Sequence, residues 1–94
     1  MRSDATPPPF SLPAVLDTRT AVPLRDALLA RRGEVLTLDG SEVTRLGGLC
    51  LEVLLSARRT WADDAMPFRL ANPSDALAEG LAIFGATNLL GGEA

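Results

Sequence analysis

Apolar and polar residues alternate along this chain in blocks that predict both strands and helices. The run Val35–Leu38 is almost continuously apolar and stops at Asp39, so it predicts a central strand that is buried on both faces of a sheet. Phe68–Ala71 predicts another strand. Phe10–Leu16 predicts a short edge strand that is broken or bent at Pro13, because proline has no N–H to donate to a neighbouring strand.

A first helix is predicted between the edge strand and the central strand, ending near Arg32, where a glycine follows. Leu24 and Leu28 have the spacing of one helix face. Pro23 fits best in the first turn of a helix, which favours Thr20 as the N-cap. The other candidate caps are Asp17 and Thr18.

The second helix is predicted over about Gly48–Ala62. Its apolar residues form two adjoining stripes, so its apolar face is wider than a surface helix needs. We expect either burial on both flanks or an exposed apolar patch, which would favour homodimerisation or obligate assembly. The main stripe contains Leu46, Cys50, Val53, Leu54, Ala57 and Trp61, and the neighbouring stripe contains Leu51, Leu55 and Arg58.

A strong signal for a third helix begins at Asn72, which can cap the helix, with Pro73 at its first position and Asp75 in its first turn. Gly85 is the predicted end of this helix. Leu89-Leu90 predicts either a last strand or a hydrophobic tail. The residues expected to line the third helix are Leu77, Leu81 and Phe84.

The alternation of strands and helices predicts an α/β fold, with three helices and a mostly parallel or mixed sheet of about four strands. The chain of 94 residues is expected to form one small domain over residues 10–94. Residues 1–9 contain three consecutive prolines, which favour extended geometry, so they are predicted to form a tail.

Charge and composition narrow the class of function. The net charge is −3, whereas binding to nucleic acid needs a basic face, so we expect no nucleic-acid partner. No apolar run approaches the roughly 18 residues of a membrane span, so direct membrane insertion is not expected. The polar, proline-rich start does not have the pattern of a signal peptide, and a cytoplasmic bacterial protein is predicted.

The residue types that most enzymes use are scarce in this sequence. It has no histidine and one cysteine, Cys50, so zinc sites and Cys-His nucleophile pairs are not expected. Cys50 lies in the second predicted helix, where a free thiol usually behaves as a small hydrophobe. Asp63 and Asp64 are expected at a solvated helix end. We therefore predict no catalytic residues, no metal and no cofactor.

Gly47 and Gly48 mark the best candidate site, at the start of the second predicted helix. Glycines there leave backbone N–H groups uncovered, which is a favourable place for a carboxylate or phosphate. Close packing or unusual dihedral angles would explain the glycines equally well. The strand before them would place this loop at the carboxyl end of the sheet, where open α/β sheets usually bind ligands.

The region from Leu38 to Leu55 resembles the signature of the sulfate-transporter and anti-sigma-antagonist (STAS) domain. That signature runs aliphatic-Asp-x-Ser-x-Val-x-x-aliphatic-Asp-Ser-Ser-Gly-Leu before an apolar helix. The resemblance covers Phe10–Phe84 in the order of elements. The positions that match are Leu38, Asp39, Ser41, Val43, Leu46, Leu51, Val53, Leu54 and Leu55.

The chain departs from the family where members carry Asp-Ser-Ser-Gly, because it has Gly47-Gly48-Leu49-Cys50. The second serine of that motif is phosphorylated in sigma-factor regulators, and it falls on Leu49. The resemblance thus implies a binding role, while Leu49 removes the usual phospho-switch and supplies an apolar contact instead. Ser41 and Thr44 are the hydroxyls left near the motif. The residues predicted to bind the partner are Thr44, Arg45, Gly47, Gly48, Leu49 and Glu52.

The resemblance implies a non-catalytic regulatory module that docks on a cytoplasmic protein. Partners within the family include ATP-binding anti-sigma kinases, chemotaxis and other signalling assemblies, and the ATPases of lipid transporters. A stand-alone protein of a chemotaxis cluster is the preferred context. The alternative is an accessory subunit that stabilises the ATPase of a lipid-transport ABC complex, and an enzyme is a third class that nothing in the sequence favours.

Overall fold

The computed structural model describes residues 8–89 of the chain as a two-layer α/β domain. Strands and helices follow the predicted order with two differences: the edge strand is divided into two, and a short strand that was not predicted, Arg45–Leu46, follows the central strand. Leu46, predicted on the main stripe of the second helix, lies in this short strand. The elements are β1 (Phe10–Ser11), β2 (Val15–Leu16), α1 (Thr18–Leu29), β3 (Leu36–Asp39), β4 (Arg45–Leu46), α2 (Gly48–Asp63), β5 (Phe68–Ala71), α3 (Asp75–Ile83) and the short 3₁₀ helix η1 (Thr87–Leu89).

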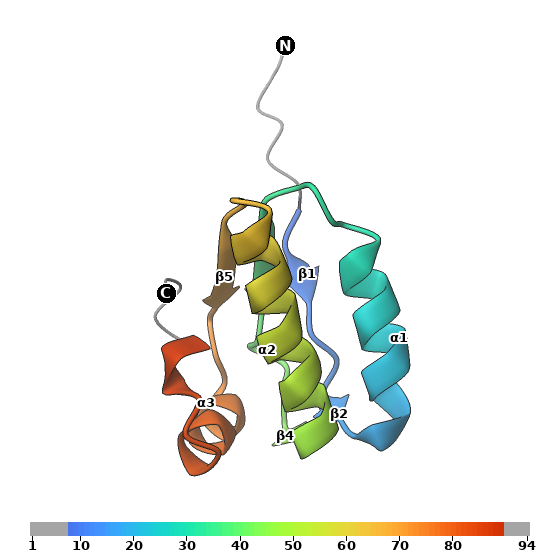
Figure 1. Cartoon of the computed structure of the whole chain (residues 1–94). Helices are drawn as coiled ribbons and strands as arrows, with labels where there is room; N and C mark the ends of the chain where they lie inside the picture. Colours follow the sequence, from blue (N-terminus) through green and yellow to red (C-terminus); the bar gives the residue numbers. More distant parts are fainter. Residues whose placement is uncertain (1–7, 90–94) are drawn as a thin grey trace.

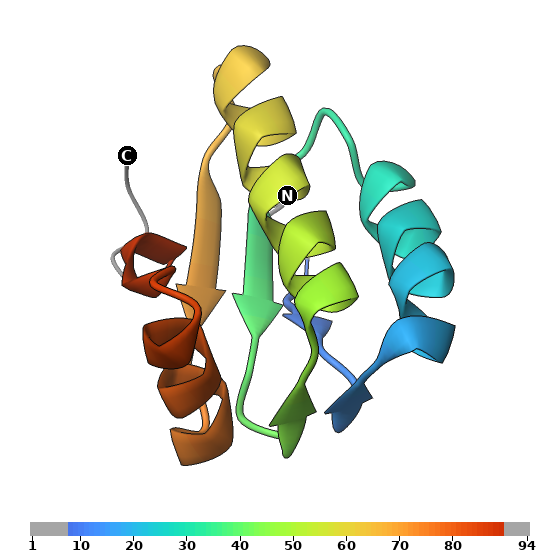
Figure 2. The same cartoon turned by 60° about the horizontal axis from the view of Figure 1, so that its bottom comes forward.

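The strands form two parallel sheets, in keeping with the predicted α/β class. A three-stranded sheet has the order β1-β3-β5, so β3 is the central strand, as predicted. Leu38 of β3 stands opposite Phe10 on one side and Leu70 on the other. The second sheet has two strands and pairs β2 with β4 beyond the carboxyl ends of β1 and β3 (Figure 2). The break between β1 and β2 falls around Pro13, which confirms the predicted interruption of the edge strand.

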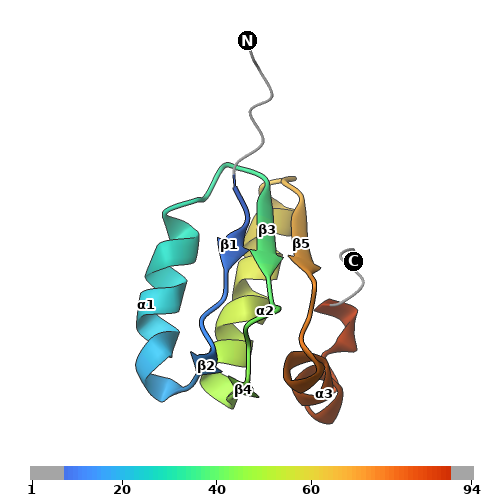
Figure 3. The same cartoon turned by 180° about the vertical axis from the view of Figure 1, so that it is seen from behind.

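Within residues 8–89, helices cover one face of the sheet and leave the other uncovered, so the prediction that β3 is buried on both faces was wrong. Leu36 and Leu38 are buried, whereas Thr37 and Asp39 between them are only partly buried. Helices α1 and α2 lie together on the first face, and Figure 3 shows β1, β3 and β5 from the other. The threonine in the apolar run was the local sign of this alternation.

Helix α1 begins and ends about three residues earlier than predicted. Its N-cap is Asp17, whose carboxylate accepts from the backbone N–H of Arg19 and Thr20, while the Thr20 hydroxyl accepts from the Asp17 N–H. This reciprocal capping box satisfies backbone N–H groups at both Asp17 and Thr20 and fixes the start of the helix at Thr18. Pro23 therefore lies in the second turn, where the Arg19 carbonyl lacks its usual helical donor.

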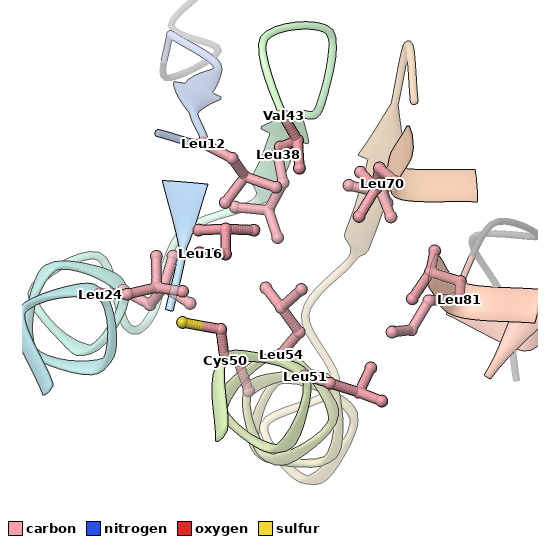
Figure 4. Packing of buried hydrophobic residues seen from close by; sticks show 14 of the residues in the cluster. Leu12, Leu16, Leu24, Leu38, Val43, Cys50, Leu51, Leu54, Leu70 and Leu81 are labelled. Carbon is pink, nitrogen blue, oxygen red and sulfur yellow. The ribbon is translucent and has the colours of Figure 1, made fainter. Parts of the chain in front are cut away.

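Helix α2 has nearly the predicted bounds, and the chain itself covers its wide apolar face. Cys50 points toward Leu24 of α1, Leu54 points toward the sheet, and Leu51 extends toward Leu81 of α3 (Figure 4). Burial on both flanks is therefore the correct explanation of the width, and homodimerisation stays a prediction. The buried residues of α2 are Cys50, Leu51, Leu54, Ala57 and Trp61.

Helix α3 is capped by Ser74, which corrects the prediction of Asn72 as the cap. The Ser74 hydroxyl accepts from the Leu77 N–H at 3.0 Å and donates to the Val43 carbonyl at 2.6 Å. Asn72 instead has a φ of 51°, so it forms the turn that precedes the helix, and Pro73 lies outside the helix. Asp75 is in the first turn, as predicted.

The predictions for the buried face and the end of α3 are confirmed only in part. Leu77 and Leu81 are buried as predicted, but Phe84 is half-exposed. Gly85, with a φ of 71°, follows the helix and reverses the chain. Leu89 is buried in η1 and forms no strand, and Leu90 lies outside the described residues, as does most of the predicted tail over residues 1–9.

Candidate functional site

The start of α2 is held at the carboxyl end of the sheet, as the sequence predicted. The Gly47 N–H donates to the Leu16 carbonyl at 2.8 Å, which extends the β2–β4 ladder to the first residue before the helix. The Leu51 N–H donates to the Gly47 carbonyl at 3.0 Å and opens the helical ladder. No side chain caps this helix start, so its position depends on the backbone of the neighbouring strand.

The two glycines of this helix start have different explanations. A Cβ on Gly47 would lie 3.2 Å from the Leu16 carbonyl oxygen, so close packing accounts for this glycine. A Cβ on Gly48 would meet nothing within 4 Å, and its φ is not in the left-handed region. Packing therefore does not require Gly48, whose lack of a side chain leaves the first turn of α2 accessible.

Leu49, in the first turn of α2, is 50% exposed. It lines a cavity of about 410 Å³ together with Glu52, on the outer side of the α1–α2 pair. The other lining residues, from α1 and the next turn of α2, are Thr18, Ala21, Val22, Arg25, Val53 and Ser56. Two of the six predicted site residues are thus brought to one cavity.

A second cavity of about 210 Å³ continues the first toward the carboxyl ends of both helices. The two share Arg25, Val53 and Ser56, so together they form one groove, which we call the α1–α2 groove. The residues found only in the second part are Leu28, Leu29, Ala57 and Thr60.

The wall that α1 contributes to the groove was missed in the sequence analysis. Val22 and Leu29 are 57% and 43% exposed, and neither belongs to the Leu24–Leu28 stripe that packs on the core. Apolar residues outside the core-facing stripe were the signal that could have revealed this wall. Their association with Leu49 depends on how α1 and α2 pack, which the local sequence does not specify.

Thr44 and Arg45 lie on the approach to α2 rather than in the groove. The Thr44 hydroxyl donates to the Ala14 carbonyl at 3.0 Å, so it helps to join the β4 segment to the segment before β2. A phosphate on Thr44 would remove this donor. Arg45 is exposed on β4. Of the six predicted residues, Thr44 and Arg45 thus precede the helix start, Gly47 and Gly48 form it, and Leu49 and Glu52 line the groove.

The loop between β3 and β4 is fixed by Asp39. Its carboxylate accepts from the backbone N–H of Ser41 at 2.9 Å. This hydrogen bond, together with one from the Ser41 side chain, lowers the pKa of Asp39 from its ordinary value. The backbone N–H of Ser41, rather than its hydroxyl, is therefore the main donor to Asp39.

Cys50 is buried against α1, as expected for a thiol that acts as a small hydrophobe. Its Sγ lies 3.2 Å from the Asp17 carbonyl oxygen and 3.6 Å from the Thr20 hydroxyl.

Within residues 8–89, no group of three or more potential metal-ligating side chains comes together. Over the same range, no helix has both the length and the apolar character needed to span a membrane.

Comparison with known proteins places the chain in a family. The family model described as "Mlab, STAS domain" matches residues 2–91. No match was found among curated proteins. Because the family model covers nearly the whole of this 94-residue chain, and its fold is the α/β arrangement described above, the chain belongs to the STAS domain family.

Proposed function

We propose that this chain is a non-catalytic regulatory module that docks on a cytoplasmic signalling protein through the start of α2. STAS domains are in general protein-interaction modules. The observation that carries the proposal is the half-exposed Leu49 at the position where family members present the phosphorylated hydroxyl. An apolar side chain at this place favours contact with a protein surface.

The docking surface consists of the six residues that surround this helix start. Gly48 leaves the first turn open, Leu49 supplies the apolar contact, and Arg45 and Glu52 flank them with opposite charges. Charges at the rim of an interface fix the orientation of the partner more than they raise affinity. The complete set is Thr44, Arg45, Gly47, Gly48, Leu49 and Glu52.

Binding is proposed to be constitutive, without a phospho-switch in this chain. In a relative with a hydroxyl here, phosphorylation adds about two negative charges to the docking surface and expels the partner. Leu49 cannot undergo that reaction. Incubation with ATP and a cognate kinase should therefore leave the intact mass unchanged, whereas a gain of about 80 Da at Ser41 or Thr44 would contradict this part of the proposal.

The preferred partner belongs to a chemotaxis or related signalling assembly. An accessory subunit of a lipid-transport ABC complex is the second candidate, because an apolar groove without a switch also suits a permanent assembly. Mass spectrometry of proteins captured by the wild-type chain distinguishes the two. Recovery of a receptor array, kinase or response regulator supports the first, and recovery of an ABC ATPase with its permease supports the second.

Leu49→Asp tests the docking surface. We expect the partner to be lost, with a fall in the free energy of unfolding of about 1 kcal/mol or less, because the side chain is half-exposed. Ile83→Asp is the matched control, since Ile83 is an exposed apolar residue of another helix. Equal capture by wild type and Leu49→Asp would exclude this surface, and collapse of the fold would show that Leu49 is part of the core.

A further inference from the structure

The α1–α2 groove extends well beyond the residues predicted to bind a partner. It follows both helices from Thr18 and Leu49 to Leu29 and Thr60. Helix α1 has 12 residues, so the groove is about 18 Å long. Figure 1 shows α1 and α2 side by side along this length.

We infer that this groove receives an amphipathic helix of the protein partner. This inference rests on the proposed function and names the structural element that the partner contributes. A groove of this length accommodates about three turns of helix, which present apolar side chains at positions i, i+3 or i+4, and i+7.

The groove does not suit the other common ways of binding a peptide. Both of its walls are helices, which offer no row of unpaired backbone groups for an added strand. None of its lining residues is aromatic, although grooves that bind proline-rich segments are lined by aromatic side chains. Its floor contains the buried small residues Ala21 and Ala57, and the exposed Ser56 is a third small side chain in its lining, so another helix can approach closely.

The charged side chains on the two walls of the groove determine which charges a complementary partner helix must have. Arg25 stands on the α1 wall and Glu52 on the α2 wall. Within residues 8–89, Arg25 pairs with its neighbour Asp26, at 3.3 Å, and both side chains are more than half exposed, so this pair contributes little and is easily exchanged for a partner's carboxylate. The complementary helix has an apolar stripe with an acidic residue on one flank and a basic residue on the other.

A membrane surface is disfavoured as the occupant by the same charges. Interfacial binding to anionic lipid needs a cluster of basic residues, whereas the groove has one basic and one acidic side chain, and the chain has a net charge of −3.

Three synthetic helical peptides of about 14 residues, each held by a side-chain lactam, test the inference by fluorescence anisotropy with the full chain. The first has three leucines at the required spacing, with one acidic and one basic flank. The second has the same leucines with two basic flanks, and the third replaces the leucines with asparagine. We expect saturable binding of the first, weaker binding of the second and no binding of the third.

Arg25→Glu should reverse the order of the first two peptides. With two acidic walls, affinity for the mixed peptide should fall about tenfold and affinity for the basic peptide should rise by a similar factor. Arg69→Glu is the matched control, because Arg69 is exposed on β5 between the buried Phe68 and Leu70 and therefore faces away from the helices. Failure of the mixed peptide to bind, or equal effects of the two substitutions, would overturn the inference.

Val22→Ser separates the groove from the docking surface. Val22 is exposed on α1, where it lines the groove opposite Leu49 without being one of the six docking-surface residues, and Ile83→Ser is its control on α3. Loss of the captured partner with Leu49→Asp but not with Val22→Ser would leave the proposed function intact and overturn the helix-in-groove inference. If neither substitution weakens capture of the partner, the docking surface is excluded. The peptide series alone then tests the helix-in-groove inference.

The remaining alternative is that a second copy of this chain occupies the groove. Light scattering after size exclusion would detect the resulting dimer. A dimer that Val22→Ser dissociates would overturn the inference in favour of self-association. A monomer at the concentrations used for peptide binding supports it.

Discussion

At the scale of single residues, two glycines show how strongly the cost of one methyl group depends on its surroundings. Gly40 is buried at the end of β3, where an added Cβ would overlap a terminal methyl of Leu77 and lie 3.5 Å from the Pro73 Cα. Leu77 is fully buried and has little room to move. Gly48, in contrast, faces open space at the first position of α2.

Gly40→Ala should therefore lower the free energy of unfolding by about 1–3 kcal/mol, because the core must shift to accept the methyl group. Gly48→Ala should raise it by up to about 1 kcal/mol, because alanine is the better helix former. Urea unfolding of both variants measures the difference. Equal effects of the two would show that Leu77 relaxes freely and that the end of β3 is loosely packed.

At the scale of elements, the helix boundaries depend on which polar side chain captures the first backbone N–H groups. Ser74 does so for α3 and also reaches the Val43 carbonyl, so it links the helix to the loop before β4. Asn72 adopts a left-handed conformation that glycine accepts without strain.

Ser74→Ala should lower the free energy of unfolding by about 1–2 kcal/mol, since it removes a cap and a partly buried hydrogen bond. Asn72→Gly should leave it unchanged or raise it slightly. Thermal unfolding followed by circular dichroism checks both, with about 4–8 °C expected for each kcal/mol in a domain of this size. If Asn72→Gly lowered the melting temperature more than Ser74→Ala does, Asn72 rather than Ser74 would be the cap.

Sequence periodicity predicted the edge strand, β3, β5 and the body of α2, because these depend on local runs of apolar residues, but it missed the two-residue strand β4. The caps of α1 and α3 could not be chosen from the sequence, because several candidate side chains lay within three residues of one another. Leu49 was predicted from its place in a motif. The α1 wall of the groove was not, since Val22 and Leu49 meet only through the packing of two helices distant in the sequence.

At the scale of the whole molecule, two partly buried carboxylates stabilise loops at separate places. Asp39 accepts from Ser41 after the central strand. Asp64, at the end of α2, accepts from the Arg32 guanidinium at 2.8 Å and ties α2 to the loop that follows α1. The hydrogen bond from Arg32 lowers the pKa of Asp64 below its ordinary value, against a smaller opposing effect of burial.

The pH dependence of stability follows from these two lowered pKa values. Each carboxylate stabilises the fold above its unfolded pKa, near 4, and this contribution is lost as pH falls through the lower folded pKa. Stability should therefore decrease below about pH 4. In Asp39→Asn and Asp64→Asn this decrease should be smaller, and urea unfolding at several pH values measures it. Glu79→Gln is the control for removal of an exposed charge, and equal slopes in all variants would contradict the assignment.

The burial of Cys50 has a practical consequence. It is the single cysteine of the chain, it is 0% exposed, and its sulfur lies against the first turn of α1. A thiol reagent can reach it only when α1 separates from α2 or the domain unfolds. The rate of alkylation would therefore report the opening of the α1–α2 pair without any introduced label, and a helix bound in the groove between them should slow that rate.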